Sequence, residues 1–325
     1  MKGTDVRIVF MGTPDFAVAS LRALVEGGYQ VVGVITAPDK PAGRGQVMHQ
    51  TAVKVYAQSQ GLKVLQPEKL KDVEFIEALR SLKADLQVVV AFRMLPVVVW
   101  DMPALGTFNL HASLLPKYRG AAPLNWALIN GETESGVTTF KLQHEIDTGN
   151  IIFQERVAIG PNDNVEVLHD RLMEIGSGLV LKTVEALAEG NVKFVSQDEL
   201  IAKGDLPCPA PKIFKNDCLI HWENSALSIH NFVRGLSPYP AAWMKLIAED
   251  DQTELTAKIY QVAPEEGKVE VAPGTIQSDL KTFVKIAVKD GFISIKEIQL
   301  AGKKRMKVDE FLRGFQQIVK YKAIV

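Results

Sequence analysis

Short hydrophobic runs alternate with amphipathic stretches along the first half of the chain. In the amphipathic stretches, apolar residues recur at helical spacing, which predicts helices that end near Val25, Gln60 and Leu82. Thr13 is the expected cap of the first helix, with Pro14 as its first residue. The apolar runs predict buried strands over Val6–Met11, Gln30–Thr36, Lys63–Gln66, Leu86–Phe92 and Gly106–Leu110. This alternation indicates an α/β fold with a parallel, doubly wound sheet.

The pattern changes from Gly136 onward. A pair of strands is expected over Gly136–Leu142 and Ile151–Ile159, followed by a long helix over Asn164–Glu189. The prolines of Pro207–Pro211 interrupt regular structure. Beyond them, a helix over Ser225–Leu236 precedes short strands broken by Gly and Pro, which favour a small β-barrel. We therefore expect a catalytic domain over residues 1–190, a linker over 191–211 and a β-barrel domain over 212–325.

Composition excludes several classes of protein. With 47% hydrophobic residues, 23% charged residues and a net charge of −1, the chain is typical of a globular protein and not of a disordered one. Two cysteines argue against a disulfide framework and favour a reducing compartment. No apolar run approaches the roughly 18 residues that cross a bilayer. A cytoplasmic location and no membrane association are therefore expected. A monomer is expected as well.

Neither a nucleotide cofactor nor a metal is indicated. The first strand-to-helix turn contains only Gly12 where a dinucleotide-binding turn has three glycines, and the chain has no Walker A sequence. Cys208, Cys218, His221 and His230 could in principle hold zinc, but their spacing matches no known zinc pattern. No metal site is expected.

Asn109 and His111 are the strongest candidates for catalysis. Residues two apart on a strand point to the same side, so an amide and an imidazole project together where ligands bind in open α/β sheets. Their hydrogen-bond donors could polarise a carbonyl and hold a developing oxyanion. The acidic turn that contains Asp147 could orient the histidine or take up protons through water. Structural roles, as a core histidine and a turn-forming aspartate, are the alternatives.

Two basic regions could contact a polyanion. Between Lys40 and Glu68 the chain has no acidic residue, and Arg44 lies between two glycines in a connection longer than most. Residues 281–325 carry eleven basic and four acidic side chains, and Lys303, Lys304 and Arg305 are adjacent there. Each region could be a solvated surface or a phosphate-binding surface. Charge alone does not distinguish the two.

Taken together, five segments resemble the folate-dependent formyltransferases, and among them the enzymes that formylate methionyl initiator tRNA. The likeness covers nearly the whole chain. Its carrying segments are Phe10–Phe16, Pro38–Gly45, Asn109–Pro123, Ile146–Gly149 and Ala301–Met306 followed by Phe311–Gly314.

The resemblance implies a Rossmann-like catalytic domain joined to a small, OB-like β-barrel that helps to bind tRNA. It implies transfer of the formyl group of 10-formyltetrahydrofolate to the α-amino group of methionyl initiator tRNA, for translation initiation and without a metal. By position, Asn109, His111 and Asp147 are its catalytic residues. The folate site is expected to include Ser113, Leu114, Leu115, Pro116, Phe92, Met94 and Leu95, and the tRNA contacts Lys40, Arg44, Lys303, Lys304 and Arg305.

Two departures and two alternatives are worth testing. Ala91–Pro96 differs from the Tyr-Gly that is commoner in the family, and Ser237–Ala242 differs from its Asn-Pro-Trp-Pro-Gly-Ala. A formyltransferase acting on a sugar nucleotide or on glycinamide ribonucleotide is the first alternative, and it would need neither basic region. The second is an inert tRNA-binding protein on the same scaffold, which the intact Asn109, His111 and Asp147 disfavour.

Overall fold

The computed structural model describes residues 2–42 and 47–324, which form two compact units. One unit comprises Met1–Ala121, Glu134–Val157 and His169–Ala210, and the other comprises Ala122–Thr133, Ala158–Leu168 and Pro211–Val325. Residues 191–211, expected to be a linker, contain the helix α7 (Gln197–Ala202) and the strand β11 (Pro209–Ala210). The expected domain limits remain a prediction.

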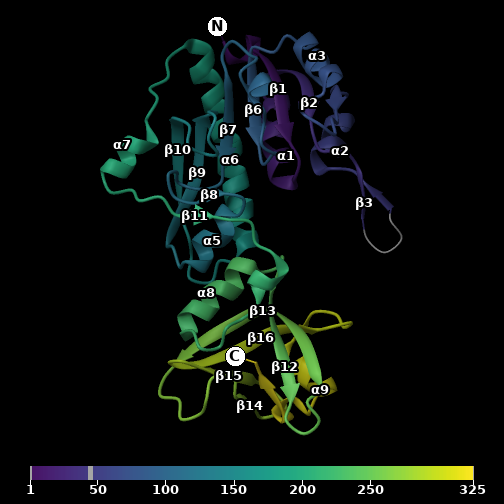
Figure 1. Cartoon of the computed structure of the whole chain (residues 1–325), viewed down its shortest axis with the longest axis vertical. Coiled ribbons are helices and arrows are strands. Elements are labelled where there is room, and N and C mark those ends of the chain that lie inside the picture. The colour runs from purple at the N-terminus through teal and green to yellow at the C-terminus, as the bar shows by residue number, and fades with distance from the viewer. Residues whose placement is uncertain (1, 43–46, 325) are drawn as a thin grey trace. The chain divides into compact units, whose positions relative to one another are not determined.

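The first unit is built on a seven-stranded sheet. Strands β5, β2, β1, β6 and β7 run parallel, and β9 pairs with β7 in the antiparallel direction, so the expected mostly parallel, Rossmann-like sheet is confirmed. In spatial order the sheet consists of β10 (Ile151–Ala158), β9 (Glu134–Lys141), β7 (Thr107–His111), β6 (Leu86–Val90), β1 (Arg7–Gly12), β2 (Gln30–Ile35) and β5 (Val64–Leu65) (Figure 1).

Helices pack on the sheet through alternate side chains of its strands. Val9 and Met11 of β1 belong to a buried cluster with residues of α3 and α4. On α1, Phe16 contacts the ring of His169 on α6, with centroids 5.3 Å apart. The helices of this unit are α1 (Asp15–Glu26), α2 (Ala52–Ser59), α3 (Val73–Ser81), α4 (Val97–Trp100), α7 and most of α6 (Val165–Glu189).

Three local expectations need correction. The cap of α1 is Pro14 and not Thr13, because Pro14 is the last residue with extended backbone, at ψ 175°. Helix α3 begins at Val73 rather than near Glu68, since Asp72 also has extended backbone, at ψ 133°. The long connection after β2, for which no regular structure was expected, contains the paired strands β3 (Lys40–Ala42) and β4 (Val47–His49).

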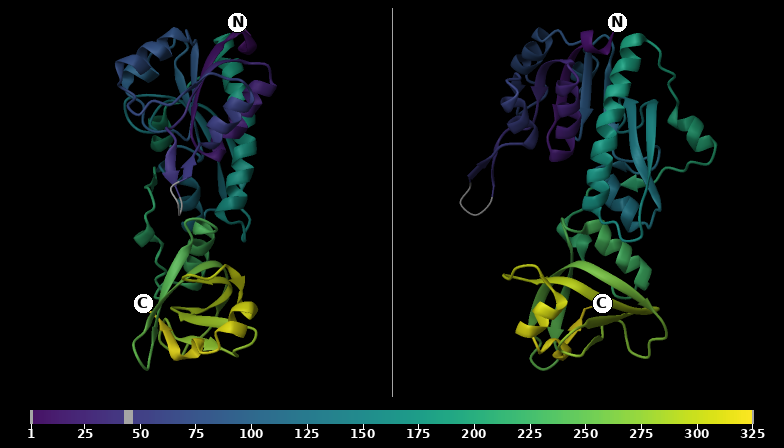
Figure 2. Two further views of the ribbon diagram at one scale, coloured as in Figure 1. Left: turned by 90° about the vertical axis from the view of Figure 1, so that its right-hand side faces the viewer. Right: turned by 180° about the vertical axis from the view of Figure 1, so that it is seen from behind.

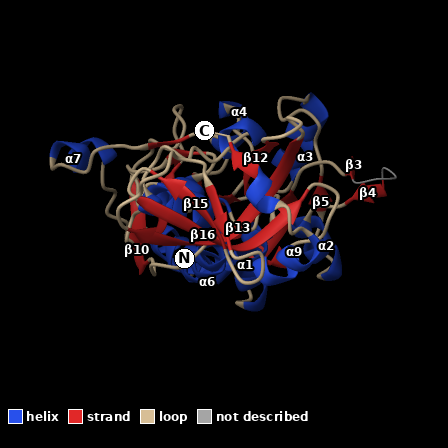
Figure 3. Cartoon of the chain, turned by 90° about the horizontal axis from the view of Figure 1, so that it is seen from below, coloured by secondary structure: helices blue, strands red, loops and turns tan. Residues whose placement is uncertain are grey.

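The second unit contains the expected small β-barrel. Its strands follow the order β14 (Ile276–Ser278), β15 (Val284–Val288), β16 (Gly291–Leu300), β13 (Glu254–Glu266), β12 (Ala242–Ala248) and β18 (Tyr321–Ala323) (red in Figure 3). The short strand β17 (Met306–Lys307) pairs with β16. The backbone N–H of Ala323 donates to the carbonyl of Gly274 at 3.0 Å, so the two ends of the sheet nearly meet.

Three α-helices, α8 (Ala226–Leu236), α5 (Pro123–Ile129) and α9 (Val308–Gly314), accompany the barrel among the described residues of this unit. Helix α8 lies where a helix was expected, and the side chain of Ser225 caps it by accepting from the backbone N–H of Ser228. Its apolar face joins the barrel core, where Trp222 is fully buried. Helices α5 and α9 were not predicted, although the proline that begins α5 is a signal for a helix start. Figure 2 shows the same elements from two further sides.

Candidate active site

Asn109 and His111 lie on β7, the strand that links the parallel part of the sheet to β9. Leu110, between them, is buried against α6, where a Cβ at Gly176 would lie 2.8 Å from the Leu110 side chain. The absence of a Cβ at Gly176 therefore lets α6 pack closely on this strand. Since Leu110 points toward α6, Asn109 and His111 point to the other side of the strand.

The imidazole of His111 is buried, and one of its two nitrogens is held by a hydrogen bond. Its Nε2 lies 2.8 Å from the carbonyl oxygen of Tyr118, and because a carbonyl can only accept, Nε2 carries the proton. Its Nδ1 lies 3.9 Å from Oδ2 of Asp147, within ion-pair range and beyond hydrogen-bond range. The edge of the ring packs against Phe140. Nδ1 is therefore the nitrogen left to act on a ligand.

Asp147 reaches this site from a distant loop. Its backbone is in the left-handed region, at φ +55°, which aspartate tolerates better than most residues. Oδ2 accepts a hydrogen bond of 3.0 Å from the backbone N–H of Gly120. His111 and Asp147 thus lie close together in the folded chain. Their positions in the sequence, 36 residues apart, could not show this.

The amide of Asn109 has an unsatisfied atom. Its Oδ1 is buried and has no hydrogen-bond partner among the described residues. Buried polar atoms without partners are rare in folded proteins and often belong to functional groups. Because the oxygen and nitrogen of an amide can exchange places by rotation, this group can offer a ligand either an acceptor or a donor.

The loop after β7 is shaped by its own hydrogen bonds. Ser113 Oγ donates to the carbonyl of Lys117 at 2.7 Å, and Thr138 Oγ1 donates to the carbonyl of Ser113 at 2.6 Å. Ser113, Leu115 and Pro116 are buried and Leu114 is half-buried, so most of these expected folate contacts face the protein. The hydrogen bonds of Ser113 and Thr138 fix the loop that carries the Tyr118 carbonyl.

A cavity of about 570 Å³ lies in the first unit, between the segment after β6, the residues before α3 and His144. Met94 and Leu95, two of the expected folate residues, line it, whereas Phe92 packs into the neighbouring core cluster. Arg93 is turned away and donates to the carbonyls of Pro67 and Glu68. The remaining lining is mostly apolar, with one basic side chain and one imidazole: Leu70, Lys71, Pro96, Val97, Val98, Trp100 and His144.

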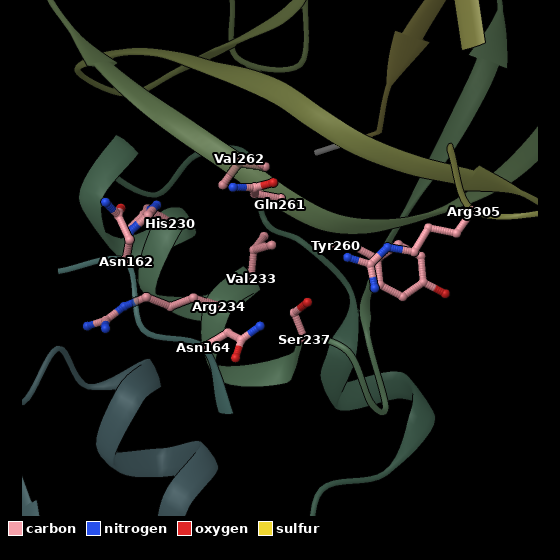
Figure 4. A pocket seen from close by; sticks show the side chains of 10 residues that line it. All are labelled: Asn162, Asn164, His230, Val233, Arg234, Ser237, Tyr260, Gln261, Val262 and Arg305. Carbon is pink, nitrogen blue, oxygen red and sulfur yellow. The ribbon is translucent and has the colours of Figure 1, made fainter. Parts of the chain in front are cut away.

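Of the expected tRNA contacts, Lys40, Lys303 and Lys304 are exposed. Arg44 lies outside the described residues. Arg305 pairs with Glu297, and its guanidinium carbon lies 4.4 Å from the centre of the Tyr260 ring. This stacked pair lines a second cavity, of about 180 Å³, within the second unit; its other lining residues include His230, Arg234 and Ser237 (Figure 4).

Sequence reasoning did not find Gln197, which is buried at the start of α7. Its amide contacts the loop of Asp147 and the side chain of Arg119. A glutamine in a polar stretch gives no signal of burial, so nothing in the pattern could have identified it. Among residues 2–42 and 47–324, no group of three or more His, Cys, Asp and Glu side chains is placed to hold a metal. No helix in these ranges is long and apolar enough to cross a membrane.

Comparison with known proteins agrees with this geometry. The family model of the formyl transferase domain matches residues 6–184, and that of the formyl transferase C-terminal domain matches residues 212–316. A methionyl-tRNA formyltransferase from Parabacteroides distasonis is 60% identical, over 99% of both chains. The chain belongs to the methionyl-tRNA formyltransferase family. Other members include the enzymes from Bacteroides fragilis, at 57% identity over the whole of both chains, and Flavobacterium johnsoniae, at 52% over 95% of this chain and 96% of that one.

Solved structures share the fold at lower identity. A sugar 3N-formyl transferase, WlaRD, has a TM-score of 0.62 at 22% identity and covers 92% of this chain and 99% of that one. HypX from Aquifex aeolicus, in complex with tetrahydrofolic acid, has a TM-score of 0.62 at 19% identity, over 97% of this chain and 48% of that one. Both parts of the methionyl-tRNA formyltransferase fold therefore recur in proteins of distant sequence.

Proposed function

We propose that this protein transfers the formyl group of 10-formyltetrahydrofolate to the α-amino group of methionyl initiator tRNA, acting as a monomer in the cytoplasm. The observation that carries the proposal is the identity of 57–61% with methionyl-tRNA formyltransferases along essentially the whole chain. This likeness includes the barrel unit as well as the unit that contains Asn109, His111 and Asp147.

Asn109 and His111 are the proposed stabilisers of negative charge on the formyl oxygen. The reaction forms a bond between the amine nitrogen and the formyl carbon, and it breaks the bond from that carbon to N10 of the folate. The Asn109 amide has a buried atom without a partner, and Nδ1 of His111 is not used by a hydrogen bond to the protein. With its amide turned so that the nitrogen faces the ligand, Asn109 would donate to the oxygen as its charge develops, and so would Nδ1 of a protonated His111.

Asp147 has the proposed role of supporting His111 and moving a proton. Its carboxylate oxygen Oδ2 lies 3.9 Å from Nδ1 of His111, within ion-pair range. The attacking amine must lose a proton and N10 must gain one. A carboxylate fixed by the Gly120 N–H can relay this proton directly or through water.

The folate is proposed to bind in the larger cavity of the first unit. A volume of about 570 Å³ lies within the range of ligand sites, and its apolar lining suits a flat ring system. Met94, Leu95 and Trp100 would contact the rings, and the ammonium of Lys71 suits the carboxylates of the glutamate tail. The bound folate supplies the formyl group.

The tRNA is proposed to contact the two basic regions. Lys40 at the base of the β3–β4 hairpin and the adjacent Lys303 and Lys304 are exposed and can approach phosphates. Arg44 is proposed to contact the acceptor end. Arg305 already pairs with Glu297, so we assign it the role of ordering this turn as well as adding charge.

Formylation assays test the function directly. Purified protein with 10-formyltetrahydrofolate is offered methionyl initiator tRNA in one reaction and an aminosugar nucleotide in another. Formyl-methionyl-tRNA in the first reaction and no product in the second are expected. Product from the aminosugar nucleotide alone would establish the alternative formyltransferase, and folate binding without any transfer would establish an inert binding protein.

A further inference from the structure

The segment between the two family-model matches makes close contacts with the catalytic loops. We name residues 195–210 the return segment. After α6, the chain pairs with β10 at Val195, forms α7, and then returns as β11, which pairs with β8 (Arg119–Gly120) (Figure 1). It belongs entirely to the first unit. At its start, Val195 and Ile151 exchange backbone hydrogen bonds of 2.8 and 2.9 Å. Val195 and Leu200 pack against the cluster of Leu115, Phe140 and Ile151.

Gln197 uses its whole amide to join two catalytic loops. Its Nε2 donates to the carbonyls of Asp147 and Gly149, at 2.9 and 2.8 Å. Its Oε1 accepts from Nε and Nη2 of Arg119, at 3.0 and 2.7 Å. The side chain is 2% exposed, so these bonds form away from solvent, where each is costly to leave unmade.

The hydrogen bonds of Gln197 lie on both sides of the contact between Gly120 and Asp147. Arg119 and Asp147 flank the hydrogen bond from the Gly120 N–H to the Asp147 carboxylate. Gln197 therefore fixes both segments that this hydrogen bond joins, the one at Arg119 and Gly120 and the loop of Asp147. Without it, the loop at Asp147 keeps a left-handed backbone with fewer contacts to maintain it.

The other end of the return segment holds His111. The N–H of Tyr118 donates to the carbonyl of Cys208 at 2.6 Å, and the carbonyl of Tyr118 accepts from Nε2 of His111. Pro209 and Ala210 pair in parallel with Arg119 and Gly120. A Cβ on Gly120 would lie 2.5 Å from the Ala210 carbonyl oxygen, which shows how closely β8 and β11 approach each other.

We propose that the return segment is part of the catalytic apparatus and that Gln197 is a positioning residue, which holds Asp147 in register with His111. This inference rests on the proposed function, because its assay measures formyl transfer. It assigns a role in the chemical step to residues that lie outside both family-model matches and were expected to belong to a linker.

Two substitutions separate the two halves of the Gln197 amide. Gln197→Met keeps the approximate shape and removes every hydrogen bond. Gln197→Glu keeps an acceptor for Arg119 but replaces the donor by an oxygen that faces the carbonyls of Asp147 and Gly149. We expect kcat at saturating substrates to fall at least tenfold in both variants, while KM for the folate and the Kd for tRNA change less than about twofold. A tenfold loss corresponds to about 1.4 kcal/mol.

The control is Glu199→Gln, which removes a charge from an exposed position on the same helix and should leave kcat unchanged. Thermal unfolding and circular dichroism measure the folded fraction of each variant. Wild-type kcat in Gln197→Glu would overturn the proposal, and so would a loss of kcat that the folded fraction fully accounts for. If Gln197→Met does not fold, Gln197→Glu alone decides. Failure of the wild-type protein to formylate methionyl-tRNA would instead contradict the proposed function.

Discussion

Two connections in the first unit look alike in sequence and differ in structure. The hairpin segment (residues 36–51) and the return segment are both long and polar, without a strong helix or strand pattern. The hairpin segment is fixed near its base, where Asp39 pairs with Lys54 at 2.5 Å and accepts from Gln66 at 2.8 Å. The return segment is hydrogen-bonded to β10 at Val195, to the Asp147 loop at Gln197, and to Tyr118 and β8 over Cys208–Ala210.

The difference indicates two ways in which a connection can serve a reaction. A segment fixed at its base presents side chains to a partner, so its effect depends on their charge and reach. A segment bonded along its length to catalytic loops acts through geometry, because a catalytic group displaced by about 1 Å can lose a large part of its effect. Four substitutions test this contrast, in order of decreasing expected effect.

The largest effect is expected from His111→Ala, which removes the group that the return segment is proposed to hold. Loss of one oxyanion donor costs on the order of 10²–10³ in kcat. Rapid-quench formylation assays should therefore show a kcat far below one tenth of the wild-type value, with tRNA binding retained. A variant that keeps more than about one tenth of the activity would refute the oxyanion role.

Gly120→Ala should disturb the return segment directly. Gly120 has φ +125°, and a new Cβ would meet the Ala210 carbonyl at 2.5 Å. We expect kcat to fall about tenfold or more, and the free energy of unfolding to fall by about 1–3 kcal/mol. The matched control is Gly178→Ala on α6, where an added Cβ meets no atom within 4 Å. This substitution should stabilise the helix by up to about 1 kcal/mol. Equal kinetics in the two variants would contradict the role of this pairing.

Arg44→Leu tests the hairpin segment through a residue outside the described ranges. An arginine between two glycines can contact a phosphate or stack on an unpaired base. We expect kcat/KM for methionyl initiator tRNA to fall at least tenfold, about 1.4 kcal/mol, with KM for the folate unchanged. Steady-state kinetics with each substrate varied in turn provide the measurement. Unchanged kcat/KM for tRNA would leave its recognition to the barrel unit.

The smallest effect is expected from Asp39→Asn, at the base of the hairpin segment. Hydrogen bonds from Lys54 and Gln66 lower the pKa of the Asp39 carboxyl below 3.8. Its contribution to stability is therefore present above about pH 4 and is lost as the pH falls through the lowered pKa. Because the pair is near the surface, we expect the Tm at pH 7 to change by less than about 2 °C. Thermal unfolding at pH 7 and pH 3.5 should show a smaller acid-induced loss in the variant, and a large fall at pH 7 would show that the base is essential to the fold.

Much of the fold could be predicted because its signals are local. Buried strands such as β1 and β6 are continuous apolar runs, and α8 has both a serine cap and an apolar face. The elements that were missed, among them α5, α7 and α9, are short. Short elements carry too few periods for a pattern, and tertiary contacts stabilise them instead.

Local patterns in the sequence predict the alternation of strands and helices and the placement of Asn109 and His111 on one side of a strand, and they include the motifs that indicate formyl transfer. These features depend on neighbours in the chain or on fixed periodicities. Only the tertiary structure brought Asp147 to His111 and buried Gln197 between Arg119 and the Asp147 loop. A hydrogen bond between residues 50 or 78 positions apart depends on how the whole sheet folds, and no local pattern specifies it.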